Sequence, residues 1–321
     1  AGALRGNGKD QTSCAFEMQM ERLAAALDLD PLEIRRNNAL RAGDPMSTSG
    51  QNIEGSLPSL QVLDAIEHIP LPPDGGDDDP RLLPGGTGLT TSPSNVVRGV
   101  GYALGLKNLA FSEGFDDFSE ARVILTPAGV EVHTAAIEVG QGLVTVCQQI
   151  ARTILGTEKV AIIWDDTSKI GSAGSTSASR QTQMTGGAVH AASVELRDAI
   201  LEAHGADELR ADGAYRNGSL VASIDEICTD GPVEHHVTFR HPETELPDEN
   251  GQGNVHAGFV VAAHRAVVDV DPELGLVRVV SVDTAQDVGR ALNPQAIVGQ
   301  LEGGIMQGMG FAVMEHLVVE D

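Results

Sequence analysis

The sequence predicts an α+β fold with mixed sheets and flanking helices. Two observations predict it: several segments place apolar residues at helical spacing, and others form short strand-like runs separated by turn residues. The two kinds of segment alternate along the chain, and the sequence shows no internal repeat. With 321 residues, of which 41% are hydrophobic, the chain can bury a sizeable core in two domains or in one large domain.

The first forty residues predict two helices in succession. Apolar residues follow Ser13 at helical spacing as far as Leu27, and we expect Ser13 to cap this helix. A second, short helix begins at Pro31, because Pro suits the first helical position and Asp30 can cap the N-terminus. This corner lacks the basic charge that DNA binding requires.

Residues 46–97 are rich in Pro, Gly and Asp, which predicts a partly disordered linker. We expect one short helix, 57–66, to interrupt it. The chain is thereby divided into residues 1–45, the linker 46–97 and a large domain, 98–321.

Strands and helices alternate in the large domain. The expected strands are 99–105, a hairpin of 121–125 and 130–134, strand 160–164, and an antiparallel pair of 262–270 and 276–283 around the turn 271–275. The expected helices are 143–155, 187–203 and 294–309.

Composition and charge exclude several classes of function. The chain has 21 Lys and Arg against 46 Asp and Glu, a net charge of −25, so nucleic acid and anionic membranes are poor partners. No apolar run approaches the roughly 18 residues of a membrane span. Cys14, Cys147 and Cys228 are odd in number and far apart, so we expect neither disulfides nor a Cys-ligated metal, and we expect a cytoplasmic protein.

Three glycine-rich segments are candidate ligand-binding loops: 5–8, 139–142 and 171–182. In each, exposed main-chain N–H groups and uncharged side chains can approach phosphate closely. The alternative is that they are ordinary loops, or, for residues 171–182, a flexible linker.

Other familiar sites are absent from the sequence. No dinucleotide-binding or Walker A motif is present, and no GxSxG motif supports acyl hydrolysis. Five histidines occur close together, but their spacing matches no zinc pattern. They are His235, His236, His241, His256 and His264.

Taken together, the motifs resemble the molybdenum-cofactor-binding subunit of the xanthine dehydrogenase/aldehyde oxidase family, and most closely its bacterial xanthine dehydrogenase branch. The resemblance covers most of the chain and is carried by residues 4–11, 20–24, 30–38, 111–114, 138–142, 174–182, 287–294 and 299–304. It implies two molybdopterin-binding domains, the first ending within residues 1–45 and the second formed by residues 98–321 and truncated at its C-terminus.

The resemblance also implies a cofactor, a reaction and partners. The cofactor is Mo-molybdopterin or its cytosine dinucleotide form, and the oxidoreductase reaction is the hydroxylation of a purine of the hypoxanthine or xanthine type. Electrons leave through [2Fe–2S] clusters and FAD on partner chains or domains, since three Cys cannot hold two such clusters. A dimer of multi-subunit units is expected.

By the same resemblance, the expected cofactor contacts are Arg5, Gly6, Gly140, Gln141, Ala178, Ser179, Arg180, Gln181 and Gln300. Gln141 is expected beside the metal, where its amide bonds a molybdenum oxo group. Asn7 and Phe111 are expected at the substrate. Asn7 stands where the family usually carries Phe, so half of an aromatic clamp is missing.

No catalytic residue is assigned within the chain. The family's general-base Glu is expected beyond Asp321, so we expect the isolated chain to be inactive. Two alternatives remain open: a relative that oxidises aldehydes, other heteroaromatic compounds or carbon monoxide, and an inactive fragment or assembly partner that keeps only the fold.

Overall fold

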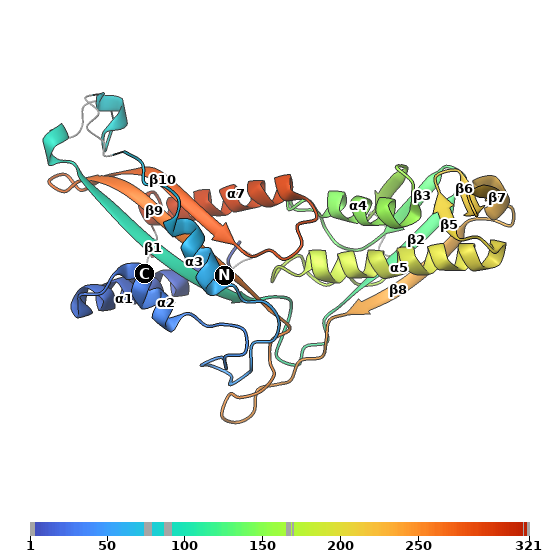
Figure 1. Cartoon of the computed structure of the whole chain (residues 1–321), viewed down its shortest axis with the longest axis horizontal. Coiled ribbons are helices and arrows are strands. Elements are labelled where there is room, and N and C mark those ends of the chain that lie inside the picture. Colours follow the sequence, from blue (N-terminus) through green and yellow to red (C-terminus); the bar gives the residue numbers. More distant parts are fainter. Residues whose placement is uncertain are drawn as a thin grey trace.

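The computed structural model describes residues 4–73, 79–86, 92–164, 168, 170–316 and 318–319. Its elements form two lobes that lie end to end in an elongated molecule (Figure 1). The first lobe contains the antiparallel sheet β1-β9-β10, and the second contains the sheet β4-β3-β2-β8 and the small sheet β5-β6-β7. The α+β class is confirmed.

The first lobe joins strands that are distant in the sequence. β1 (Val97–Asn108) pairs with β9 (Phe259–Asp271), which also pairs with β10 (Leu276–Gln286). The carboxylate of Asp271 accepts the main-chain N–H groups of Glu273 and Leu274 and closes the predicted turn between β9 and β10. This predicted strand pair is confirmed.

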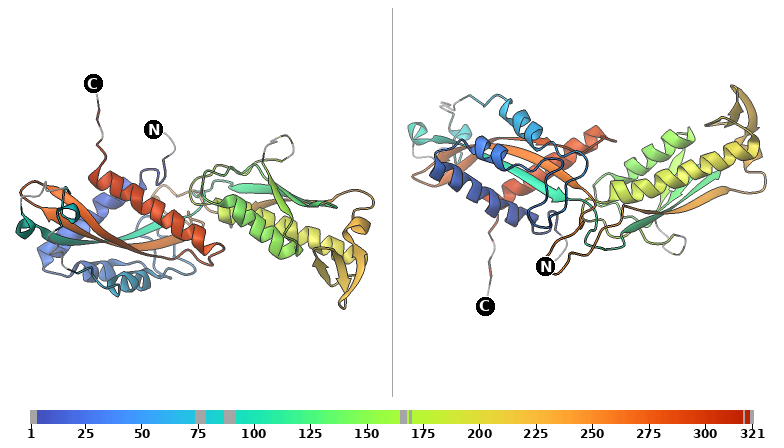
Figure 2. Two further views of the ribbon diagram at one scale, coloured as in Figure 1. Left: turned by 90° about the horizontal axis from the view of Figure 1, so that it is seen from above. Right: turned by 60° about the horizontal axis from the view of Figure 1, so that its bottom comes forward.

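Three helices, α1 (Lys9–Leu27), α2 (Pro31–Asn38) and α3 (Ser59–Glu67), lie on one face of this sheet, and α7 (Pro294–Val313) crosses the other (Figure 2). The Asp30 cap of α2 is confirmed, since its carboxylate accepts N–H groups from Leu32 and Glu33. The Ser13 cap is wrong. α1 begins at Lys9 because Gly8 adopts a left-handed conformation, φ 87°, that starts the helix one turn earlier.

The stretch expected as a linker contributes to the core of the first lobe. Ile53, Leu57, Leu63 and Ile66 are buried against α2 and β9, and α3 forms close to its predicted position. Short 3₁₀ turns occur at η1 (Pro80–Leu82) and η2 (Pro93–Asn95). Of the predicted disorder, residues 74–78 and 87–91 lie outside the described residues, and the predicted domain boundaries remain a prediction.

The second lobe is a sheet covered on one face by two helices (Figure 2). The predicted hairpin is confirmed as β2 (Phe118–Thr126) and β3 (Gly129–His133), with β4 (Val160–Ile163) parallel to β3 and β8 (Val233–Arg240) antiparallel to β2. The helices are α4 (Leu143–Leu155), as predicted, and α5 (Gln181–His204). Their shared core consists mainly of small and branched side chains, among them Val123, Val132, Cys147, Ala188 and Leu196.

Several elements differ from the sequence prediction. α5 starts at Gln181 rather than residue 187, and α7 extends to Val313 rather than residue 309. β8 and the small unit at the far end of the second lobe were not predicted. That unit consists of β5 (Glu208–Arg210), β6 (Gly213–Arg216), β7 (Ser219–Ser223) and α6 (Ile224–Ile227).

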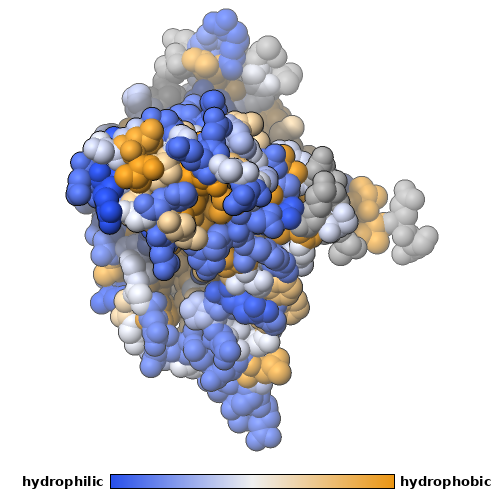
Figure 3. All heavy atoms as spheres, turned by 90° about the vertical axis from the view of Figure 1, so that its right-hand side faces the viewer, coloured by the Kyte–Doolittle hydropathy of each residue, from blue (hydrophilic) through white to orange (hydrophobic). Residues whose placement is uncertain are grey.

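Seen from the end of the second lobe, the surface is mainly hydrophilic with scattered apolar groups (Figure 3), in keeping with the net charge of −25. None of the helices in the described ranges has both the length and the apolar character needed to cross a bilayer.

Candidate active site

Three predicted site residues from distant parts of the sequence are joined by hydrogen bonds. The Nη2 atom of Arg5 donates to the main-chain oxygen of Gln300 on α7 at 2.5 Å and to its Oε1 atom at 3.4 Å. The Nε2 atom of Gln300 donates in turn to the main-chain oxygen of Gly140 at 3.1 Å. Gln307, two turns further along α7, donates to the main-chain oxygen of Arg5 at 2.9 Å. The first lobe thereby contacts the glycine-rich loop that precedes α4.

Glu138 organises this loop, residues 137–142. Its carboxylate accepts the main-chain N–H groups of Gly140 (2.8 Å), Gly142 (3.0 Å) and Val144 (3.1 Å). Burial raises the pKa of Glu138, but these hydrogen bonds outweigh it and hold the pKa below its ordinary value. Sequence reasoning assigned Glu138 no role, although an acidic residue just before the start of a helix is a recognisable capping signal.

The side chain of Gln141 is bonded within its own loop. Its Nε2 atom donates to the main-chain oxygen of Ile137 at 3.1 Å, and its Oε1 atom accepts the N–H of Val139 at 2.6 Å. The expected bond from Gln141 to a molybdenum oxo group therefore stays a prediction. Gly140 is exposed with φ 95°, and no atom lies within 4 Å of the place a Cβ would take, so this side of the loop is open.

The second glycine-rich loop, residues 171–181, adjoins the first. The Oγ1 atom of Thr176 donates to the main-chain oxygen of Ile137 at 3.0 Å. The side-chain amide of Gln181 donates to Ser175 at 3.2 Å and to Thr176 at 3.3 Å. Gln181 is buried, so its side chain supports the loop from within.

Arg180 differs from the role expected for an arginine at a phosphate site, because its side chain is fully buried. Its guanidinium forms a two-pronged ion pair with Asp117, in which Nε lies 2.9 Å from Oδ2 and Nη2 contacts Oδ1. It also donates to the main-chain oxygens of Ala173 and Phe118. Any contact of residue 180 with a ligand must therefore come from its main chain. Sequence reasoning missed Asp117, since nothing in the 63-residue spacing indicates the pair.

Ala178 and Ser179 both adopt left-handed conformations, each with φ 54°. Such conformations are unfavourable for residues other than Gly and often occur at functional sites. Within the described ranges, no acceptor is found for the main-chain N–H of either residue. Two main-chain donors thus remain available in the loop that was predicted to bind the pterin and phosphate groups.

Phe111 is part of the same assembly. Its N–H donates to Oδ2 of Asp117 at 3.1 Å, and the guanidinium of Arg180 lies 5.3 Å from its ring centroid. Phe115 packs against it edge to face, with 5.2 Å between ring centroids. Phe111 itself is half-buried, which leaves part of the ring accessible.

The N-terminal motif forms a tight turn before α1. Gly6 is required there, because with φ 91° a Cβ would lie 2.1 Å from the Oδ2 atom of Asp10. Asn7 is exposed, has φ 48°, and donates its N–H to the main-chain oxygen of Leu4 at 2.9 Å. No contact joins Asn7 to Phe111 among the described residues. The two expected substrate contacts thus lie in separate parts of the assembly.

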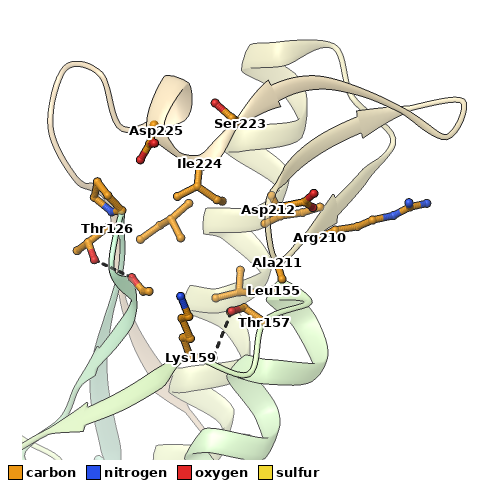
Figure 4. Close-up of a pocket in the computed structure, with 14 residues that line it drawn as sticks. Thr126, Leu155, Thr157, Lys159, Arg210, Ala211, Asp212, Ser223, Ile224 and Asp225 are labelled. Carbon is orange, nitrogen blue, oxygen red and sulfur yellow. Dashed lines mark hydrogen bonds between the residues drawn. The ribbon is translucent and has the colours of Figure 1, made fainter.

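A cavity of about 230 Å³ lies elsewhere, between α6, β5 and the hairpin of the second lobe (Figure 4). Thr126, Leu155, Lys159 and Asp225 are among the residues that line it, and no predicted site residue does. The chemistry predicted from the sequence therefore belongs to the loop assembly rather than to this cavity.

The donors of the assembly suit an anionic, oxygen-rich group. They comprise the exposed guanidinium of Arg5, glutamine amides, hydroxyl groups and free main-chain N–H groups. No cluster of His, Cys, Asp and Glu that could hold a metal ion occurs among the residues that the structure describes. The residues present therefore fit a phosphate-bearing cofactor better than a metal ion ligated by side chains.

Comparison with known proteins gives a consistent result. A family model described as a molybdopterin cofactor-binding domain matches residues 89–321, and a second model with the same description matches residues 1–39. The chain is 28% identical over its whole length to a probable xanthine dehydrogenase subunit of Bacillus subtilis, and covers 42% of that protein. It is 29% identical over 98% of its length to an aldehyde oxidoreductase of Megalodesulfovibrio gigas, and covers 32% of that protein.

A solved structure supports the same assignment. The aldehyde oxidoreductase from Desulfovibrio gigas superposes with a TM-score of 0.74 and 28% identity, over 96% of this chain and 32% of that one. The chain therefore spans less than half the length of these relatives. The predicted resemblance and the molybdopterin cofactor are confirmed. The chain belongs to the molybdopterin cofactor-binding domains of the xanthine dehydrogenase/aldehyde oxidase family.

Proposed function

We propose that this chain holds its molybdopterin cofactor where Arg5, Gln300 and the loops 137–142 and 171–181 meet, and that it serves an enzyme that hydroxylates a purine of the hypoxanthine or xanthine type. The observation that carries the proposal is the hydrogen-bonded chain from Arg5 through Gln300 to Gly140. It brings together residues up to 295 positions apart that had each been assigned to the cofactor.

Each residue has a separable task. The guanidinium of Arg5 attracts phosphate or oxo oxygens, and Gln300 fixes its position. Glu138 holds the glycine-rich loop in shape, and the free N–H groups of Ala178 and Ser179 donate to cofactor oxygens. Phe111 packs against the flat face of a heteroaromatic ring. When bound, the cofactor supplies the redox-active molybdenum that accepts two electrons from the substrate.

The reaction replaces a substrate C–H bond by C–OH, takes the oxygen from water and releases two electrons and two protons. Glu138 and Asp117 are poor candidates for the general base, because both carboxylates already accept several hydrogen bonds. We therefore assign the general base to a Glu outside this chain. The electrons pass to [2Fe–2S] and FAD partners, which assemble with the chain as a dimer of multi-subunit units in the cytoplasm.

The cofactor site is tested by the molybdenum content of the protein purified from cells that make molybdopterin. We expect Arg5→Ala and Gln300→Ala to lower molybdenum per chain about tenfold, since residues that orient a metal site contribute about 10 to 100-fold in affinity. Arg22→Ala and Gln19→Ala are matched controls, because both side chains are exposed on α1. Equal molybdenum in all four variants, or none in the unaltered protein, contradicts the assignment.

The substrate is tested on the complete multi-subunit protein with hypoxanthine, xanthine and a small aldehyde. We expect turnover of a purine, and a higher kcat/KM for it in Asn7→Phe, because a second ring face adds about 0.5–1.5 kcal/mol of aromatic contact. Oxidation of the aldehyde alone would replace the purine assignment by the aldehyde one, which the exposed polar Asn7 favours.

A further inference from the structure

Asp117 and Arg180 form the most deeply buried ion pair near the site. The side-chain exposures are 1% for Asp117 and 0% for Arg180. Asp117 ends the loop between β1 and β2, whereas Arg180 immediately precedes α5. The pair thus fastens the loop that carries Phe111 to the loop that carries Ala178 and Ser179.

The remaining donors of Arg180 hold its own loop in shape. Nη1 donates to the main-chain oxygens of Ala173 at 2.5 Å and Ser175 at 3.1 Å, and Nη2 donates to that of Phe118 at 2.9 Å. Gly174 leaves room for this arrangement, because a Cβ there would lie 2.8 Å from Nη1. A planar guanidinium with five N–H groups can satisfy all these acceptors at once, which a lysine ammonium cannot.

The same pair sets both the backbone and the ring of Phe111. Oδ2 of Asp117 accepts its N–H, and the Arg180 guanidinium lies over its ring. The two loops are also joined directly, since Ala110 donates its N–H to the main-chain oxygen of Ala178 at 3.0 Å. Both ends of this last bond adopt left-handed conformations, φ 61° at Ala110 and 54° at Ala178. Such backbone persists only where the surroundings hold it in place.

We propose that Asp117 and Arg180 are positioning residues that fix the distance between the substrate-facing ring of Phe111 and the cofactor-binding N–H groups of Ala178 and Ser179. This role rests on the proposed function of the two loops. The pair touches neither substrate nor cofactor and acts only through the residues it holds.

The test compares Arg180→Lys with Arg265→Lys. Arg265 is a matched control in the first lobe, 2% exposed, paired with Asp283 at 2.7 Å and bonded to the main-chain oxygens of Ile69 and Pro70. Both changes keep a buried positive charge and remove the planar fork. Asp117→Asn is a second variant that keeps an acceptor for Phe111 and remains informative where Arg180→Lys does not fold.

Two measurements are made on the molybdenum-loaded multi-subunit protein. Amide hydrogen exchange at Ala110, Phe111 and residues 178–179 is expected to accelerate more than tenfold in Arg180→Lys and Asp117→Asn, with no change there in Arg265→Lys. Turnover of hypoxanthine per bound molybdenum is expected to fall about 100-fold through kcat, with KM changed less than threefold, as for a displacement of about 1 Å at a reacting centre.

The outcomes separate the two claims. An active unaltered protein in which Arg180→Lys keeps its turnover per molybdenum, or loses no more than Arg265→Lys does, overturns the positioning role alone. Unchanged hydrogen exchange in both loops overturns it as well. An unaltered protein without molybdenum or without turnover of hypoxanthine overturns the proposed function, whatever the variants do.

Discussion

The helices α5 and α7 carry the two halves of the candidate site, yet they are held in different ways. α5 starts beside Arg180 and has ten buried residues, which pack against β2, β8 and α4. α7 carries Gln300 and has a single charged residue, Glu302, but none of its residues is buried. Its side-chain hydrogen bonds with the N-terminal segment run between Arg5, Gln300 and Gln307.

This difference shows that apolar composition alone does not anchor a helix. Burial of apolar surface stabilises α5, because its small residues allow close contact with the sheet. The apolar residues of α7 gain little from folding in the described part of the chain. The cofactor loop lies between the two helices, with Thr176 on the α5 side and Gln300 on the α7 side. One half of the site is therefore fixed by packing and the other by hydrogen bonds.

The largest effect expected from this comparison is that of Leu196→Ala in α5. Leu196 is 0% exposed, so the change creates a cavity and should lower the free energy of unfolding by about 2–5 kcal/mol. Met306→Ala in α7 is the matched change at a side chain that is 63% exposed, and should alter stability by no more than about 0.5 kcal/mol. Urea unfolding measures both. An equal loss in the two variants would show that α7 is packed as tightly as α5.

A second change tests how closely α5 approaches the sheet. In Gly187→Ala the new methyl group would lie 2.8 Å from the ring of Phe239 on β8, so the ring or the helix must shift. We expect a loss of about 1–3 kcal/mol in the free energy of unfolding, despite the better helix propensity of Ala. A variant at least as stable as the unaltered protein would indicate a looser contact between α5 and β8.

A smaller, pH-dependent effect is expected at the loop between the helices. Glu138→Gln should lower the free energy of unfolding by about 1–2 kcal/mol at pH 7, because hydrogen bonds to a charged acceptor become neutral ones. The pKa of Glu138 is depressed in the folded state, so its contribution is complete above its ordinary value of 4.5 and is lost as the pH falls through the folded-state value. The difference between the two proteins should therefore be constant near pH 7 and shrink below about pH 4.5. A difference that grows as the pH falls would contradict the depressed pKa.

The smallest effect expected is a gain in stability. In Gly308→Ala on α7, nothing lies within 4 Å of the new methyl group, so only helix propensity changes. We expect unfolding to require about 0.5–1 kcal/mol more. Opposite signs for Gly308→Ala and Gly187→Ala would express the contrast between the two helices in one measurement. A loss at residue 308 would instead reveal a close neighbour of α7.

Local signals in the sequence determined most of the elements. The Asp30 cap and Pro31 define the start of α2, and the hairpin of β2 and β3 and the turn after Asp271 formed as expected. These features depend on residues a few positions apart, so their energetics can be read from neighbouring residues. The motifs were likewise sufficient to identify the family and its molybdopterin cofactor.

Only the tertiary structure decided which distant segments meet. The start of α5 was predicted too late because Gly186 and Gly187 oppose helix formation in isolation, whereas in the fold they allow Ile150 and Phe239 to approach the helix. Arg180 was expected at the ligand, but its partner Asp117 lies 63 residues away and binds the whole guanidinium. The link from Arg5 to Gln300 spans 295 positions. Such contacts form because each lobe must satisfy its buried charges and fill its core, and that requirement acts on the folded chain as a whole.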